Sequence, residues 1–384
     1  MIPLQPTSQS TRLPAALRYI PGVALAAGVM LLALWVSGVL GQWLLAAQGL
    51  DPANARSPVS GVTIAIVLGV VIRNIRPLPT IFMPGVAFSV ERLLRAGVIC
   101  IGIKLSLFDV MRLGAWGVPV VVAAITSGLV FVTWFNRRLK LPARLGTLIA
   151  AGTGICGVTA IVSVAPAINA NEDEVAYAVA NITLFGLIGM LCYPYVAPLL
   201  LATSEQIGLF LGTAIHDTSQ VVGSALTYRA LTGDEVAFQS AIITKLTRNL
   251  FLAVVVPLSA AVYIQGSGAS ETRRVSARHL LPAFVLGFVL MALLRTVADA
   301  TASSDTVLGV LPVERWRWLT RQVGEVWGAK YLLGTAMGAV GLSTRLGVFK
   351  SVGLRPFAVG MAGALVVGIV GLLMAHLVGR FVHM

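Results

Sequence analysis

The feature that most constrains this chain is a series of apolar runs, each about as long as a helix that crosses a lipid bilayer. The hydrocarbon core of a bilayer is roughly 30 Å thick, and a helix of about 20 apolar residues spans it. The runs lie at 19–47, 59–75, 88–108, 114–135, 145–168, 174–201, 205–229, 236–264, 279–298, 327–344 and 356–380. They predict an all-α polytopic membrane protein with about 11 transmembrane helices.

The composition excludes several other classes of protein. Hydrophobic residues make up 57% of the chain and charged residues only 11%, whereas about a quarter of the residues of a soluble domain are charged. A soluble enzyme, a disordered chain and a disulfide scaffold are therefore excluded. Cys100, Cys156 and Cys192 lie singly within apolar runs, which suggests neither a disulfide framework nor a metal site, and we expect no cofactor.

The basic residues predict how the chain is oriented. A formal charge of +13 would suggest a nucleic-acid partner in a soluble protein, but here we expect a lipid bilayer and no nucleic acid. With a cytoplasmic N-terminus, more Lys and Arg residues fall in the cytoplasmic connections than in the outer ones, as the positive-inside rule requires. The first run, 19–47, is too long for the apolar region of a signal peptide, so we expect it to remain as a span.

Five basic residues are left within or near the spans: Arg92, Arg95, Lys104, Lys245 and Arg248. Ionisable groups at membrane depth are costly and face a bundle interior or a water-filled cavity. We expect Arg92 and Arg95 to mark the end of their helix by snorkelling, and we leave Lys104 open.

Lys245 and Arg248 lie three residues apart and share one helical face. Two cations on one face favour an anionic partner, because Arg offers a bidentate fork and Lys a point charge. That partner is either a substrate anion or Asp217, in which case the contact is a structural ion pair.

Two internal similarities appear when the chain is compared with itself. Residues 93–105 match 332–344 at an offset of 239 residues; these runs are an odd number of spans apart, which is typical of the inverted repeats of secondary transporters. Residues 152–162 match 212–222 at an offset of 60 residues, which is two spans apart. No single symmetry relates both matches.

The first candidate site is the glycine-rich segment 152–157. Each Gly costs a helix roughly 1 kcal/mol relative to Ala, so the segment disfavours a continuous helix. A break in a membrane helix is tolerated where it is buried or lines a cavity, and the free N–H groups of a half-helix can hold an anion. The alternative is close helix packing through small residues. The candidate substrate-binding residues here are Thr153, Gly154, Cys156, Gly157 and Thr159.

The second candidate site is the densest polar run within any apolar segment, 216–220. His titrates near neutrality, so His216 and Asp217 are candidates for proton coupling. His216, Asp217, Thr218 and Gln220 are also candidates for substrate binding, together with Lys245 and Arg248. The alternative is that the run lies at a helix mouth, where Asp217 only pairs with a nearby cation.

Several motifs follow one another in a specific order over roughly residues 55 to 380. They are the Gly-Thr-x-Ile-Cys-Gly run at 152–157, Ala165-Pro166, 182–186, Tyr193-Pro194, the His-containing run 215–222, Lys245 with Arg248, and 339–344. In these motifs the chain resembles the YeiH-type sulfate exporter family of bacterial inner-membrane proteins.

The resemblance implies a membrane carrier related in architecture to the superfamily of bile-acid symporters and sodium–proton antiporters, in which inverted five-helix repeats contain two crossed, interrupted helices. The Asp-Asp signature of sodium–proton antiporters is absent, which argues against cation exchange. The implied parts are a cytoplasmic tail at 1–18, an extra helix at 19–47, and five-helix repeats at 55–201 and 205–380. The crossing helices would be 145–168 and 327–344, with the second interrupted near Gly334, Gly338 and Gly341.

We therefore expect a secondary transporter, not an enzyme, that exports a small anion such as sulfate or an organosulfonate by alternating access, with proton coupling. The alternatives are a sodium-coupled importer of organic anions and a passive anion channel. The expected partners are the small anionic substrate and the bilayer, and a homodimer is left open.

Overall fold

The computed structural model describes residues 17–48, 57–267, 283–302, 306–307, 309–347 and 354–382. Most of the expected N-terminal tail at 1–18 lies outside the described residues, as does the basic connection at 268–282.

Each of the eleven apolar runs contains helix. The α-helices are α1 (Ile20–Ala47), α2 (Gly61–Ile75), α3 (Met83–Phe88), α4 (Leu94–Ile101), α5 (Leu107–Arg138), α6 (Ala143–Gly154), α7 (Val158–Val164), α8 (Glu172–Leu200), α9 (Ser204–Ala214), α10 (Thr218–Thr232), α11 (Glu235–Leu250), α12 (Leu252–Ser267), α13 (Ala283–Ala300), α14 (Val313–Arg321), α15 (Gly334–Ser343) and α16 (Leu354–Val378). Two π-helical segments, η3 (Ser89–Leu93) and η7 (Gln322–Leu333), join α3 to α4 and α14 to α15. Short 3-10 turns are η1 (Leu17–Tyr19), η2 (Thr80–Phe82), η4 (Gly102–Lys104), η5 (Ala165–Ile168) and η9 (Gly379–Phe381).

The architecture is that of an all-α polytopic membrane protein, as expected. Among the described residues, five helical segments are long and apolar enough to cross a bilayer, and a sixth is present if α11 and α12, which meet at a bend of 43°, are counted as one span. The number of about 11 crossings stays a prediction. The strands found in the described residues form one short antiparallel hairpin, β1 (Thr306–Val307) with β2 (Leu311–Pro312).

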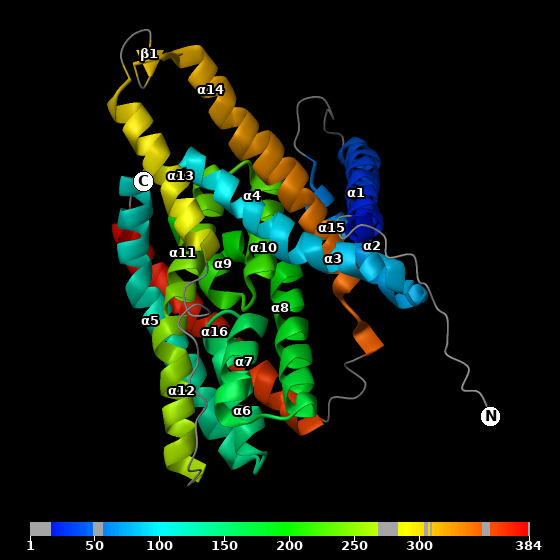
Figure 1. Ribbon diagram of the computed structural model, residues 1–384, viewed down its shortest axis with the longest axis vertical. Coiled ribbons are helices and arrows are strands. Elements are labelled where there is room, and N and C mark those ends of the chain that lie inside the picture. The colour runs from blue at the N-terminus through cyan, green and yellow to red at the C-terminus, as the bar shows by residue number, and fades with distance from the viewer. Residues whose placement is uncertain are drawn as a thin grey trace, which may run out of the picture.

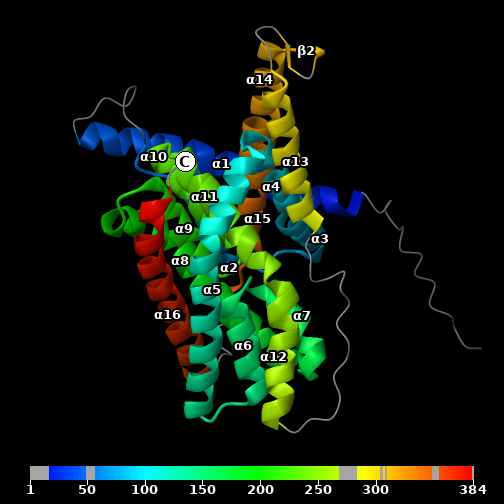
Figure 2. The ribbon, with the colours of Figure 1, turned by 90° about the vertical axis from the view of Figure 1, so that its left-hand side faces the viewer.

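The helices form two groups. In the core group, which runs from α5 to α12 and includes α16, α9 packs against α11 and α16, and α5 packs against α6 and α16. In the flanking group, made of α1–α4, α13–α15 and the two π-helical segments, α2 packs against α1 and α15, and α4 against η7. Figure 1 shows α1, α2 and α3 at the right of the molecule and α5, α11 and α12 at its left, and Figure 2 shows the core group from the side.

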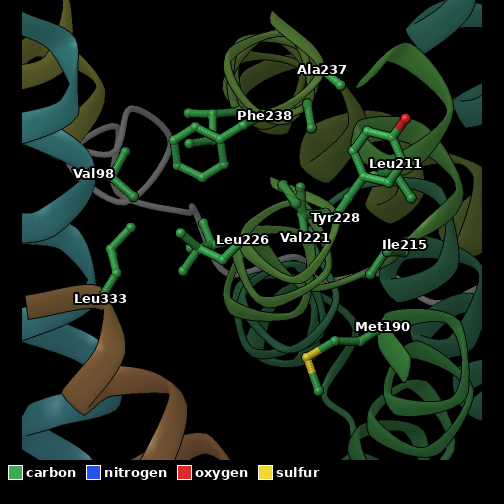
Figure 3. Packing of buried hydrophobic residues seen from close by; sticks show 14 of the residues in the cluster. Val98, Met190, Leu211, Ile215, Val221, Leu226, Tyr228, Ala237, Phe238 and Leu333 are labelled. Carbon is green, nitrogen blue, oxygen red and sulfur yellow. The ribbon is translucent and has the colours of Figure 1, made fainter. Parts of the chain in front are cut away.

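Buried apolar side chains join the two groups. Val98 of α4 and Leu333 of η7, in the flanking group, belong to the same buried cluster as Leu226 of α10 and Phe238 of α11, and Figure 3 shows these side chains facing one another. Part of the contact between the groups is therefore hydrophobic.

Local sequence explains where the helices of the core group begin. Capping boxes open α5 at Ser106, α8 at Asn171, α9 at Thr203 and α10 at Asp217. In each, the cap side chain accepts a hydrogen bond from a free N–H of the first turn while the residue three positions later bonds back. The break between α9 and α10 is thus specified by the cap that starts α10.

The expectation of an interrupted helix at 327–344 is wrong. Residues 313–343 form one unbroken helical segment with a π-helical middle, and Gly338 and Gly341 allow close packing instead. A Cβ at Gly338 would collide with the carbonyl oxygen of Ala26 in α1, and one at Gly341 with that of Ile66 in α2. The second interrupted helix lies at 205–229. The boundaries of the two five-helix repeats stay a prediction.

Candidate functional site

The two helix breaks, between α6 and α7 and between α9 and α10, meet in the core group. Gly157 precedes α7 with a φ of 68°, a conformation that only glycine adopts readily. A Cβ on Gly157 would lie 3.3 Å from the Cβ of Asp217, which caps α10. The glycine-rich run 152–157 and the polar run 216–220 are therefore in contact, although Gly157 and Asp217 are 60 residues apart in the sequence.

Lys245 of α11 joins the two breaks. Its Nζ donates to the carbonyl oxygens of Ile155 and Ile215, each at 3.1 Å, and to that of His216. Only 1% of Lys245 is exposed to solvent. Its three N–H groups, which are all that an ammonium can donate, are directed at backbone carbonyls of both breaks.

Arg248 bonds the same two breaks one turn later in α11. Its Nε donates to the carbonyl oxygen of Gly154 at 2.9 Å, and its Nη2 to that of Thr153. Its Nη1 donates to the carbonyl oxygens of Thr213 and Ile215, the latter at 3.4 Å. Arg248 is fully buried.

This geometry has a simple electrostatic cause. The last carbonyls of a helix have no partner within it and carry the negative end of the helix dipole. Both α6 and α9 end inside the protein, so their final carbonyls need donors. Lys245 and Arg248 supply them, and among the described residues neither cation forms an ion pair with a carboxylate.

A cavity of about 300 Å³ lies beside the breaks, between the core and flanking groups. Its core-group wall carries Cys156, Thr159, Asp217, Thr218 and Gln220, five of the residues selected from the sequence. Its flanking-group wall is formed by residues of η3, α4, α13 and α15. The candidates that form the frame behind this wall are Thr153, Gly154, Gly157, His216, Lys245 and Arg248.

The polar groups on the core-group wall are held by short-range hydrogen bonds. Asp217 accepts from the N–H of Ser219 at 2.8 Å and from its hydroxyl. The Gln220 amide donates to the carbonyl oxygen of Thr183 at 3.1 Å, and the Thr218 hydroxyl accepts from Asn249 at 3.2 Å. The wall therefore presents preoriented hydroxyl, amide and carboxylate groups to the cavity.

His216 is buried behind this wall, with 1% of its surface exposed. Its backbone carbonyl accepts from Lys245, while its Nδ1 has no hydrogen-bond partner within the described ranges. Thr153 Oγ1 is buried and unpartnered in the same way.

Comparison with known proteins places the chain in a family. Residues 24–360 match the family model described as "Conserved hypothetical protein 698". A UPF0324 membrane protein of Streptococcus agalactiae serotype V is 30% identical over 88% of this chain and 94% of its own length. UPF0324 membrane proteins of Fusobacterium nucleatum and Listeria monocytogenes serotype 4b are 29% and 30% identical, over 84% and 82% of this chain and 91% and 88% of their own lengths.

The chain belongs to this family, the YeiH-type family that its motifs resemble. In this YeiH-type membrane protein the runs 152–157 and 215–222, which are among the motifs of the resemblance, both contribute residues to the cavity wall.

Sequence reasoning missed three charged or amide side chains that line the cavity in this YeiH-type chain. Arg95, interpreted as a helix-end charge, lies on the flanking-group wall together with Glu91, and Asn249 joins the core-group wall. One signal could have found the first two: Glu91 and Arg95 bracket the start of the repeated segment 93–105. Glu91 lies in the π-helical segment η3, which the sequence did not predict.

Proposed function

We propose that this membrane protein is a secondary transporter that moves a small anion out of the cytoplasm by alternating access. The observation that carries the proposal is the cavity between two helix groups at the point where two interrupted helices meet. Binding sites of secondary transporters occupy such places, where unwound backbone lines a cavity. The substrate class is an oxyanion such as sulfate or an organosulfonate.

The two cations buried behind the core-group wall support an anionic substrate. Lys245 and Arg248 are buried directly behind the core-group wall, and their hydrogen-bond acceptors are neutral carbonyls. Their positive charges are therefore not cancelled by contact with a carboxylate, and in a low-dielectric interior their field extends to the cavity. The N-terminal end of α10, with Thr218 and Ser219, also faces the cavity.

In this proposal the groups that touch the anion are Cys156, Thr159, Thr218 and Gln220 on the core-group wall. Thr153, Gly154, Gly157, Lys245 and Arg248 hold the two breaks in the geometry that presents those groups. Asp217 borders the cavity, and the preceding residue, His216, is buried behind it. We assign this adjacent pair to proton coupling.

The proposed orientation has the N-terminus in the cytoplasm of a bacterium, with the chain in the inner membrane. On that orientation the flanking-group wall near Ser343 and Thr344 is on the cytoplasmic side, because Arg345 follows directly. The cavity is then the inward-facing state of the carrier.

The experiment that tests the proposal is flux of radiolabelled sulfate and of a small sulfonate in proteoliposomes, under an imposed pH or sodium gradient. Saturable flux that follows the pH gradient is expected. Flux that follows only the sodium gradient would instead support a sodium-coupled importer of organic anions. Flux that shows no saturation and ignores both gradients would support a passive channel.

A further inference from the structure

Glu91 and Arg95 form a charged pair of positions on the flanking-group wall of the cavity. Glu91 lies in η3 and Arg95 in the first turn of α4, four residues later. Residues at this spacing are neighbours on a helix surface, and both side chains line the cavity. Cys156 and Asp217, at the two breaks, line the same cavity from the core group.

Neither side chain is paired with an opposite charge among the described residues. In the part of the chain that the structure describes, Glu91 and Arg95 form no ion pair with each other or with another residue. The Arg95 guanidinium lies 5.9 Å from the ring centre of Phe284, which also lines the cavity. An aromatic face holds a guanidinium by its plane and leaves its N–H groups free to donate.

Arg95 differs from the two buried cations in the partners of its N–H groups. Lys245 and Arg248 direct their N–H groups at backbone carbonyls. Among the described residues, Arg95 is the one Lys or Arg that lines the cavity. An anion in this cavity therefore meets one exposed cationic donor whose N–H groups have no hydrogen-bond partner among the described residues.

We propose that Arg95 binds the anionic group of the transported substrate, and that Glu91 beside it weakens the binding of that anion by repulsion. This inference rests on the proposed function and adds to it the charged contact from the flanking group. An anion held between Arg95 and Thr218 touches both helix groups at once. Relative movement of the groups then separates these contacts and releases the anion.

The test uses the full-length protein with four substitutions: Arg95→Gln, Arg95→Lys, Glu91→Gln and, as the matched control, Arg92→Gln. Arg92 is exposed on the same helix and is not part of the cavity wall. Two measurements are made on each purified variant. One is the KM for sulfate or sulfonate flux in proteoliposomes, and the other is the rise in melting temperature on titration with the same anion.

The expected result is that Arg95→Gln raises the KM roughly tenfold or more and removes the anion-dependent rise in melting temperature, because a charge-assisted bidentate contact is lost. Arg95→Lys keeps the charge without the fork and falls between. Glu91→Gln lowers the KM a few-fold, and Arg92→Gln leaves it unchanged. Since Arg95 is exposed, none of these variants is expected to lose its fold.

Two results separate this inference from the proposed function. If the unchanged protein transports the anion and Arg95→Gln does so with the same KM, the inference is overturned while the carrier function stands. If the unchanged protein moves no anion yet is stabilised by it, and Arg95→Gln removes that stabilisation, the binding contact stands and the carrier function falls. A protein that neither moves nor is stabilised by sulfate or sulfonate overturns both.

Discussion

Ile155 and Ile215 present their carbonyl oxygens to the same ammonium group, each 3.1 Å from Lys245 Nζ. The two residues are equivalent in the internal repeat that relates 152–162 to 212–222. Thr153 and Thr213 are also equivalent, and both their carbonyls accept from Arg248. The repeat thus corresponds to two helix ends that are closed by one pair of cations.

The structure also shows which part of the fold each of the two internal repeats describes. The offset of 60 residues relates the two interrupted helices of the core group. The offset of 239 residues relates 93–105 to 332–344 in the flanking group, and each segment lies where a π-helical stretch gives way to an α-helix. The two offsets therefore describe two different parts of the fold.

Lys245→Gln is expected to destabilise the protein strongly. The substitution removes charge-assisted hydrogen bonds to three buried carbonyls, and each such bond contributes about 1.5–3 kcal/mol. A loss of at least about 3 kcal/mol is expected, measured as the free energy of unfolding in detergent. Lys330→Gln, at an exposed position, is the control. A Lys245→Gln protein that keeps its stability but no longer binds anion would show that Lys245 contacts the substrate instead.

Asp217→Asn is expected to separate capping from proton coupling. Asn and Asp are about equally good helix caps, and an amide oxygen can still accept from Ser219. Stability is therefore expected to change by less than about 1 kcal/mol, while anion flux loses its dependence on the pH gradient. The measurement is proteoliposome flux with and without that gradient. An Asp217→Asn variant whose flux still follows the gradient would reject this role of Asp217.

Gly157→Ala is expected to damage the first break. The φ of 68° is unfavourable for alanine, and the added Cβ would lie 3.3 Å from Asp217. A backbone position of this kind costs about 1–3 kcal/mol, so both the melting temperature and the flux should fall. The matched control is Gly28→Ala in α1, where an added Cβ meets nothing within 4 Å. Equal behaviour of the two variants would show that the break has no strict backbone requirement.

Lys104→Gln is expected to loosen the contact between the two helix groups. Lys104 Nζ lies 2.8 Å from Glu235 of α11, in the core group, and 3.2 Å from Glu325 of η7, in the flanking group. Partly exposed pairs contribute about 0–1 kcal/mol each. The population in which the two groups are separated near Lys104 should therefore increase by a few-fold at most. Pulsed electron paramagnetic resonance distances between labels on α11 and η7 measure it, with Arg112→Gln as the control. An unchanged distance distribution in Lys104→Gln would show that this ion pair does not hold the two helix groups together.

Local sequence was sufficient to predict most of the helices. The run at 174–201 corresponds to α8 within two residues, and the run at 114–135 lies inside α5, which begins earlier, at Leu107. Long apolar stretches between charged breaks have few other stable structures in a bilayer. The break at 152–157 was predicted for the same local reason, its three glycines. The interruption expected near Gly338 was wrong, because the same residue type also serves where two helix backbones approach closely.

The roles of the charged residues could not be predicted in this way. Lys245 and Arg248 share a helical face, a spacing that is equally consistent with substrate binding, an ion pair or the carbonyl contacts that are observed. Arg95 was interpreted as a helix-end charge, yet it lines the cavity. The donors and acceptors that distinguish these cases come from α6, α9 and α13, far away along the chain.

Periodicity and composition therefore establish the class of protein, the approximate helices, the glycine-rich run 152–157 and the polar run 216–220. All of these depend on neighbouring residues and on the thickness of a bilayer. The contact between the two breaks, the burial of Lys245 and the cavity that Arg95 lines depend on how distant helices pack. The physical reason is that a backbone carbonyl has no identity in the sequence. Which cation it meets is decided when the side chains of α11 reach the C-terminal ends of α6 and α9.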